Sequence, residues 1–302
     1  MTATTTQASG AAAAPPRLLA LRRFAREFAA RPAAMAGLGI LIALTILALT
    51  APLFIHASDL DVVNAPGQPL SPPSARFLLG TDYAGRSIVP LLIWGTRPSL
   101  AIAVLATALT MIVGSLIGLL AGHFGGTTSR VLMAITDWFI ALPTLPLAIA
   151  LAAVLGQGNT SITIAIAVTS WPGTARLIRA QTLAVEARPF IERARALGAR
   201  DSQLVVRQVL PNVAPFVLVS ATLTVSGAII SEVTLAFLGL GNPTDVSWGS
   251  MINQAFFQGA VSRGAWWYIL PPGIAIVIVA LAFTMIGRAV ENILNPRMAR
   301  TS

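Results

Sequence analysis

The sequence contains no cysteine and no lysine, and it has only two histidines, His56 and His123. The absence of cysteine excludes disulfides, thiolate nucleophiles and cysteine metal sites. The absence of lysine excludes a Walker A phosphate loop and a Schiff-base mechanism. Both histidines fall at the ends of apolar runs, which leaves little from which to build a metal cluster or a buried general base. We therefore predict no metal site and no catalytic residue.

Charge is also scarce. Of the 302 residues only 10% are charged and 55% are hydrophobic, and the mean hydropathy is +0.77. A soluble domain carries about 25% charged residues, so this composition indicates an all-α integral membrane protein. The net charge of +9 comes from twenty arginines. In so apolar a chain, basic loops beside a lipid bilayer explain that charge better than nucleic-acid binding does.

Long uncharged runs predict the membrane-spanning segments. A bilayer core about 30 Å thick is crossed by roughly 20 apolar residues in a helix. We expect six transmembrane helices, and Pro143 and Pro172 should kink the third and the fourth of them. The predicted spans are residues 34–56, 98–122, 132–155, 160–178, 212–237 and 267–289.

The arginines predict the orientation. Sixteen of the twenty flank the side on which both termini fall, and four lie on the other side, a bias typical of cytoplasmic loops. Residues 1–33, the first of them disordered, and the tail 291–302 are therefore both expected in the cytoplasm of a bacterium. The spans between them would cross its plasma (inner) membrane. Residues 34–97 would hold the first span and an outer segment. Within this segment, residues 80–86 should form a turn that leads to an amphipathic helix on the membrane surface.

Residues 186–211 form the longest segment predicted on the cytoplasmic side. Pro189 suits the first turn of a helix, and Gly198 suits the left-handed position that ends one. Asp201 or Ser202 can cap a second helix, which Pro211 should break. The pattern predicts a short exposed helix between two bends.

That short helix would carry Ile191, Ala194 and Leu197 on one face, since they are spaced three residues apart. A rigid knob of this kind suits a groove on another protein. An ordinary surface helix would have the same pattern, and the residues alone do not decide between the two.

Two acids lie inside or beside the spans, where charge is expensive and often functional. For Asp137 we expect a structural ion pair or a helix-end contact, with Arg130 two turns back. For Glu232 we expect interhelical hydrogen bonds, the alternative being a path for a positively charged peptide terminus. The glycine repeat at 114, 118 and 122 predicts close helix packing.

Several segments resemble one known family. Glu192-Arg193-Ala194, then Gly198 and Leu210-Pro211, resemble the EAA loop of binding-protein-dependent ABC importer permeases, with Arg193 where the commonest form has alanine. The similarity extends from about residue 17 to 296. Further segments are similar to the dipeptide/oligopeptide/nickel branch: residues 79–86, 95–100, 237–241 and 247–249.

The resemblance implies a type I (MetI-like) transmembrane domain over residues 98–290, with a coupling loop at 186–211. It implies four partners besides the lipid bilayer: a homologous permease, two cytosolic ABC ATPases that bind ATP and magnesium, and an extracytoplasmic solute-binding protein. This chain would hold no cofactor and no ATPase site. Its solutes would be dipeptides or oligopeptides, with nickel or another small solute as the alternative.

The resemblance also assigns roles within the coupling loop. Ile191 belongs to the ATPase-contacting helix, and Glu192 would anchor that helix by polar contacts. Ala194 and Gly198 would permit close approach, and Leu197 would fill an apolar pocket. Leu210 and Pro211 would fix the angle of entry into the fifth span.

Two other classes of function compete with this interpretation. An ion-coupled secondary transporter often carries inverted repeats, and no such repeat is visible. A membrane enzyme would need a nucleophile and a base in the bilayer, and no histidine lies in the middle of a predicted span.

Overall fold

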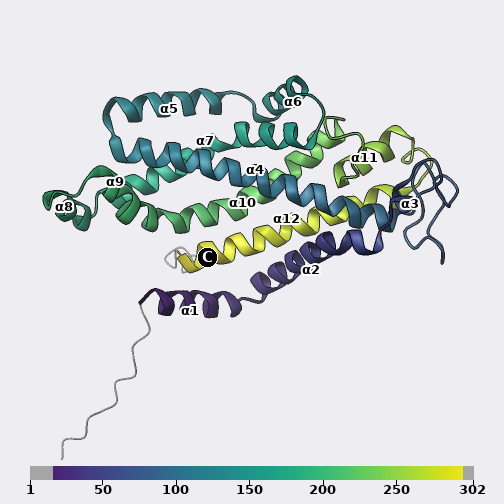
Figure 1. Cartoon of the computed structure of the whole chain (residues 1–302), viewed down its shortest axis with the longest axis horizontal. Coiled ribbons are helices and arrows are strands. Elements are labelled where there is room, and N and C mark those ends of the chain that lie inside the picture. Colours follow the sequence, from purple (N-terminus) through teal and green to yellow (C-terminus); the bar gives the residue numbers. More distant parts are fainter. Residues whose placement is uncertain (1–15, 295–302) are drawn as a thin grey trace, which may run out of the picture.

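The computed structural model describes residues 16–294, and these are helical throughout apart from connecting segments and one isolated bridge between Thr81 and Ser87. The long helices run side by side along the molecule (Figure 1). In chain order the elements are α1 (Pro16–Ala29), α2 (Pro32–Phe54), α3 (Ala57–Leu60), α4 (Ile88–Phe124), α5 (Gly126–Ala141), α6 (Thr144–Leu155), α7 (Asn159–Glu186), α8 (Pro189–Ala196), α9 (Asp201–Leu204), a π-helical segment η1 (Val205–Val209), α10 (Leu210–Phe237), α11 (Trp248–Phe257) and α12 (Trp266–Leu294).

Among the described residues, four continuous helices are long and apolar enough to cross a membrane: α2, α4, α12 and the run from α9 to α10. The pair α5 and α6, bent by 92°, raises the number to five if it is one span. The break follows Ala141 and places Pro143 at its corner, where the sequence predicts a kink. Helix α7 contains the predicted fourth span, but serines, threonines and arginines dilute its apolar composition. The predicted count of six is therefore not confirmed, whereas the all-helical membrane architecture is.

The separate surface helix predicted before the second span is absent from the part of the chain that the structure describes. Helix α4 is one helix from Ile88 onward, so no separate amphipathic helix precedes it and Pro98 lies inside it. Tertiary packing holds this first part, since Ile88 is fully buried and the indole of Trp248 donates a hydrogen bond to the Leu92 carbonyl, at 3.0 Å. Local proline chemistry is outweighed by these contacts.

Helices α4 and α7 pack closely along the predicted glycine stripe. A Cβ atom on Gly114 would lie 2.6 Å from the Cβ of Thr174, and one on Gly122 would lie 2.6 Å from the Cβ of Thr182. Between them, a Cβ on Gly118 would lie 2.6 Å from the Ala175 carbonyl oxygen. Only glycine allows the two backbones to approach this closely at three successive turns.

Two apolar clusters hold the helices together. The larger forms where α4, α6, α7, α10, α11 and α12 meet, and it buries Trp248 and Tyr268 completely. The smaller lies beneath α8 and consists of Leu119, Ile178, Val185, Ile191, Val209 and Val213. The α8 region therefore has an apolar core of its own.

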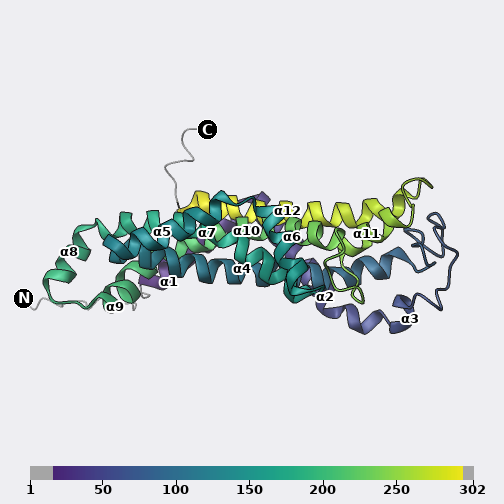
Figure 2. The ribbon, with the colours of Figure 1, turned by 90° about the horizontal axis from the view of Figure 1, so that it is seen from above.

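The two ends of the bundle differ. Both views place α8, α9 and α1 at one end, toward which the C-terminal end of α12 points, and place α3, α11 and residues 61–87 at the other (Figures 1 and 2). The arginine-rich segments predicted on one side of the membrane thus gather at one end. The disorder predicted for the first residues, and most of the predicted tail, fall outside the described residues.

Candidate functional site

Local sequence chemistry shapes α8 at both of its ends. Pro189 occupies the first turn, where its missing N–H costs nothing. Gly198 adopts a φ of +83°, and the Ala199 and Gly198 N–H groups donate to the carbonyls of Ala194 and Arg195. This is the Schellman arrangement that ends a helix. The predicted two-turn helix between two bends is confirmed.

The segment after α8 differs from the prediction. No side chain of Asp201 or Ser202 caps α9; instead the Gln203 amide oxygen accepts from the Arg200 N–H, at 3.4 Å. Pro211 does not interrupt the helix but lies in the first turn of α10. The π-helical turn just before it is wider than an α-turn, which accommodates a proline ring that would otherwise press on the preceding turn. From Asp201 to Phe237 the backbone is continuously helical.

The apolar face predicted for α8 is divided in the structure. Ile191 is fully buried in the smaller cluster, Ala194 is half-buried, and Leu197 is 88% exposed just past the helix end. Gly198 and Pro211 are exposed as well. Leu210, a predicted coupling residue, is exposed, and so are Phe190 and Val206, which the sequence pattern does not single out. Their exposure follows from which residues fill the cluster below, which no local pattern specifies.

Glu192 lies exposed in the first turn of α8. There its charge is favoured by the positive end of the helix dipole. Among the described residues, no ion pair or side-chain hydrogen bond holds its carboxylate. The carboxylate is thus available at the surface of α8.

Four ionisable side chains from α4, α7, α8 and α9 contact one another next to this surface. The Nδ1 atom of His123, at the end of α4, lies 2.5 Å from Glu186 Oε1, at the end of α7. The other ring nitrogen lies 3.5 Å from Asp201 Oδ1 of α9. Arg195 of α8 donates to the second oxygen of Glu186, at 3.1 Å. The sequence pattern around His123 does not indicate these contacts, because its partners are distant in the sequence.

Asp137 forms the expected ion pair, but with a different partner. Its carboxylate accepts from Arg176 of α7, at 2.8 Å, with 55% of each side chain exposed. Arg130 instead donates to the Thr127 hydroxyl. The pair ties α5 to α7 on the surface of the chain.

Glu232 is fully buried between α10 and the start of α11. The hydroxyls of Ser247 and Ser99 lie against it, yet neither carboxylate oxygen has a partner in hydrogen-bonding geometry. A side chain this enclosed does not line an open path in this conformation.

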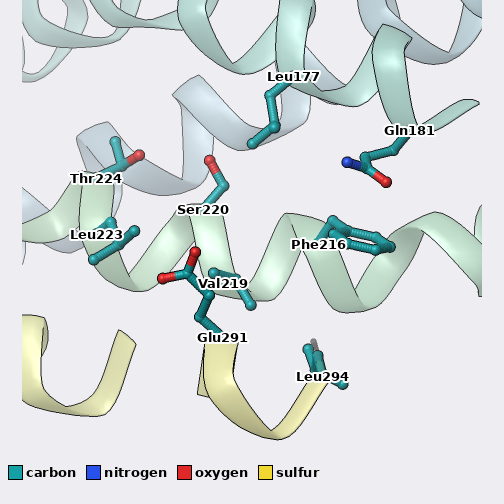
Figure 3. A pocket seen from close by; sticks show the side chains of 9 residues that line it. All are labelled: Leu177, Gln181, Phe216, Val219, Ser220, Leu223, Thr224, Glu291 and Leu294. Atoms are coloured by element: carbon teal, nitrogen blue, oxygen red, sulfur yellow. The ribbon is translucent and has the colours of Figure 1, made fainter. Parts of the chain in front are cut away.

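A cavity of about 410 Å³ lies between α7, α10 and α12, in the half of the bundle nearer α8. Figure 3 shows four polar side chains in its lining, those of Gln181, Ser220, Thr224 and Glu291, among apolar ones. Its polar groups are few and come from three helices. The cavity therefore offers apolar contact with a limited number of hydrogen-bonding positions.

The opposite end is organised by a second buried ion pair, which the sequence pattern indicates only as a turn. Asp82 and Arg86 are 2.7 Å apart, and their side chains are 0% and 4% exposed. Arg86 also donates to the Leu60 carbonyl, at 3.0 Å. Nearby, the Asn64 amide and then the Val63 N–H lower the pKa of Asp61 by hydrogen bonding to its carboxylate.

Comparisons with known proteins give the family. A family model described as "Binding-protein-dependent transport system inner membrane component" matches residues 114–300, and one described as "N-terminal TM domain of oligopeptide transport permease C" matches residues 20–73.

Individual proteins give the same result. The di/tripeptide transport system permease protein DppC of Pseudomonas aeruginosa (strain UCBPP-PA14) is 36% identical over 284 residues, 92% of each chain. The oligopeptide transport system permease protein OppC of Lactococcus lactis subsp. cremoris (strain SK11) is 33% identical, over 86% of this chain and 88% of the other. The glutathione transport system permease protein GsiD of Pectobacterium atrosepticum is 35% identical, over 75% and 74%.

A solved structure shares the fold. The inward-facing MetNI methionine ABC transporter matches with a TM-score of 0.52 at 21% identity, covering 66% of this chain and 96% of the other. At that identity the likeness shows the fold alone. Among the described residues, no group of three or more histidine, aspartate or glutamate side chains is placed to hold a metal ion.

Proposed function

The chain belongs to the family of binding-protein-dependent transport-system inner-membrane components, and on that premise we propose that it is a permease subunit of an ATP-driven peptide importer. Two relatives that match most of its length are named as di/tripeptide and oligopeptide permeases. Glutathione, named for a third, is itself a short peptide. Peptides are therefore the solute class that the relatives favour over nickel.

The proposal places the α8 end of the bundle in the cytoplasm, together with both termini. The arginines gathered at that end support this orientation. The bent pair α5 and α6 would form one span and α7 another, for a total of six. At about 1.5 Å per residue, the 28 residues of α7 reach roughly 42 Å, enough to cross a bilayer.

The observation that carries the proposal is the exposed surface of α8 and its flanks. Glu192 lies in the first turn of α8, Leu197 and Gly198 directly follow its last residue, and all three are exposed on a helix that the buried Ile191 holds in place. We propose that an ATPase subunit receives this surface in a cleft, with Leu197 in an apolar pocket and Glu192 among polar groups. Ile191 would support the helix from beneath, and Leu210 and Pro211 would set its direction relative to α10.

Transport would follow from differential binding. The ATPase subunits bind ATP with different affinity in their open and closed arrangements, and the permease spans would be carried between inward-facing and outward-facing states with them. The proposed role of this chain is to transmit that change and to form part of the solute path. The chain itself would hydrolyse no ATP.

Replacing Gly198 with arginine tests the proposal. The long side chain would stand where close approach is needed, so we expect loss of ATPase co-purification and of ATP-dependent peptide uptake in proteoliposomes holding the complete importer. Gly156→Arg is the matched control, because Gly156 has a similar φ of +87° and equally open surroundings, and it lies in the turn between α6 and α7, away from α8.

Equal ATPase recovery and uptake in the two variants would contradict the proposed docking surface. Uptake driven by a proton or sodium gradient without ATPase subunits would contradict the importer itself. Transport of nickel but not of dipeptides would change the solute and leave the rest intact.

A further inference from the structure

His123 lies between two carboxylates that come from different elements. One ring nitrogen faces Glu186 at 2.5 Å and the other faces Asp201 at 3.5 Å. The histidine side chain is 2% exposed and that of Glu186 is 12% exposed. Arg195 completes the line on the far side of Glu186. The ends of α4 and α7 and the two short helices α8 and α9 are therefore joined by one network of acidic and basic side chains.

The His123–Glu186 pair at the centre of this network differs from the exposed ion pairs of the chain, whereas the outer members Asp201 and Arg195 are 62% and 53% exposed. Arg23 and Glu27, for example, are 83% and 41% exposed and lie within a single helix, and such pairs contribute little. His123 and Glu186 are separated by 63 residues and are shielded from water. Solvent screens a buried pair much less, so removing one member leaves the other without compensation.

The chemistry of the ring explains why a histidine stands here. A neutral imidazole has one N–H donor, whereas the imidazolium donates from both nitrogens. Only the doubly protonated ring can donate to Glu186 and Asp201 together. A glutamine at this position reaches at most one of the two carboxylates with its single amide group.

The network also supplies what α8 otherwise lacks. An eight-residue helix is only about 12 Å long, and Ile191 is its one buried residue. A helix attached at one point can turn about that point. Arg195 lies four residues later, on the same face as Ile191, and its bond to Glu186 provides a second attachment. Two attachments on one face fix the direction of the helix axis.

We propose that His123 and Glu186 are positioning residues that set the direction of α8 through Arg195, and the direction of α9 through Asp201. This inference rests on the proposed function, because the direction of α8 matters only if a partner receives it. The network joins the ends of the close-packed pair α4 and α7 to the docking surface, so a displacement of α8 is passed to those two helices without rotation of α8.

The first test measures α8 in the purified chain, before any partner is added. Because the chain has no cysteine, Ala196→Cys gives a single nitroxide-labelling site at the exposed end of α8. We expect His123→Gln and Glu186→Gln to increase the mobile fraction of this label at least about fivefold, the effect of one lost hydrogen bond. A label on Phe257→Cys, 71% exposed at the other end, should not change.

Two further variants keep the test falsifiable. If His123→Gln does not fold, Arg195→Gln removes a member of the network that is 53% exposed and should mobilise the label. Arg195→Lys should restore the order of the label. His56→Gln is the matched control, since His56 is the other histidine and faces Asp59 at 3.8 Å in an exposed pair. Unchanged α8 mobility in the His123 and Glu186 variants would overturn the inference.

The second test uses the complete importer in proteoliposomes. We expect His123→Gln to retain the ATPase subunits and the KM for ATP, and to lower peptide transported per ATP at least about fivefold. A mobile label with unchanged transport per ATP would contradict α8 as the coupling element, and so the proposed function. An immobile label would contradict only the positioning role.

Discussion

Asp82 and Arg86 are the clearest case of two residues that depend on each other. They are four residues apart and almost fully buried, and Asp82 also accepts hydrogen bonds from the backbone N–H groups of Ala84 and Arg86. Burying two charges is expensive, and the expense is offset only while both are present. The sequence motif around them is therefore a structural requirement of the end of the bundle opposite α8.

Asp82→Ala should destabilise the chain strongly. It leaves the Arg86 guanidinium buried and uncompensated, for which about 3–5 kcal/mol is typical. Glu27→Ala is the matched control, since Arg23 and Glu27 have the same four-residue spacing in an exposed helix and should contribute only about 0.3–0.5 kcal/mol. Thermal unfolding in detergent measures both. Similar midpoints for the two variants would contradict the argument.

Glu232 presents the opposite case, a buried acid with no partner for its charge. An uncompensated buried charge is unfavourable, so Glu232→Gln should leave thermal stability unchanged or raise it, while Glu232→Lys should lower it. The glutamine amide can donate to the hydroxyls of Ser99 and Ser247, which lie against this position.

Transport specificity tests the pathway alternative for the same residue. Because the side chain is enclosed, Glu232→Gln should not change the ratio of uptake between a dipeptide with a free amino terminus and its N-acetylated form. A ratio that falls toward one would place Glu232 on the path of the amino terminus.

At the scale of single elements, glycine determines how closely α4 and α7 approach. Gly118→Ala would place a methyl group 2.6 Å from the Ala175 carbonyl oxygen, and overpacking of this kind costs typically about 1–3 kcal/mol. Gly227→Ala on α10 is the control, because nothing lies within 4 Å of the position that its methyl group would take and alanine is favoured there by about 0.5–1 kcal/mol. Equal thermal unfolding midpoints for the Gly118→Ala and Gly227→Ala variants would show that α4 and α7 can move apart to accommodate the methyl group without a loss of stability.

The same scale shows what a sequence can predict. Pro189 and Gly198 define α8 because first-turn proline and left-handed glycine act locally. The burial of Ile191 depends on Val209 and Val213, and the contact of His123 depends on a glutamate 63 residues away, so neither has a local signal. Proline locally predicts a helix end, and this prediction is wrong at Pro98 and Pro211. Tertiary packing accommodates the first and a π-helical turn the second, and the sequence pattern indicates neither.

At the scale of the whole molecule, the unequal ends of the bundle predict which residues are accessible from outside a cell. Single cysteines at Ala196, beside Leu197, and at Val63, which is 87% exposed at the opposite end, provide the probes. A membrane-impermeant maleimide should label only the Val63→Cys chain in intact cells, and both chains once the membrane is opened. Labelling of the Ala196→Cys chain in intact cells would contradict the proposed orientation.

The number of spans depends on the whole molecule as well. The apolar runs predict the positions of α2, α10 and α12 closely, because a lipid environment imposes their length. Pro143 indicates the kink between α5 and α6 but not its angle of 92°. The start of α4 depends on neighbouring helices, which composition does not describe.

The glycine stripe has a mechanical consequence. Helices that touch backbone to backbone at three successive turns cannot slide past one another without colliding, so α4 and α7 behave as a single stiff rod. That rod is roughly 55 Å long at about 1.5 Å per residue of α4. A push received beside His123 is therefore delivered, as tilt, to the far tip at Ile88.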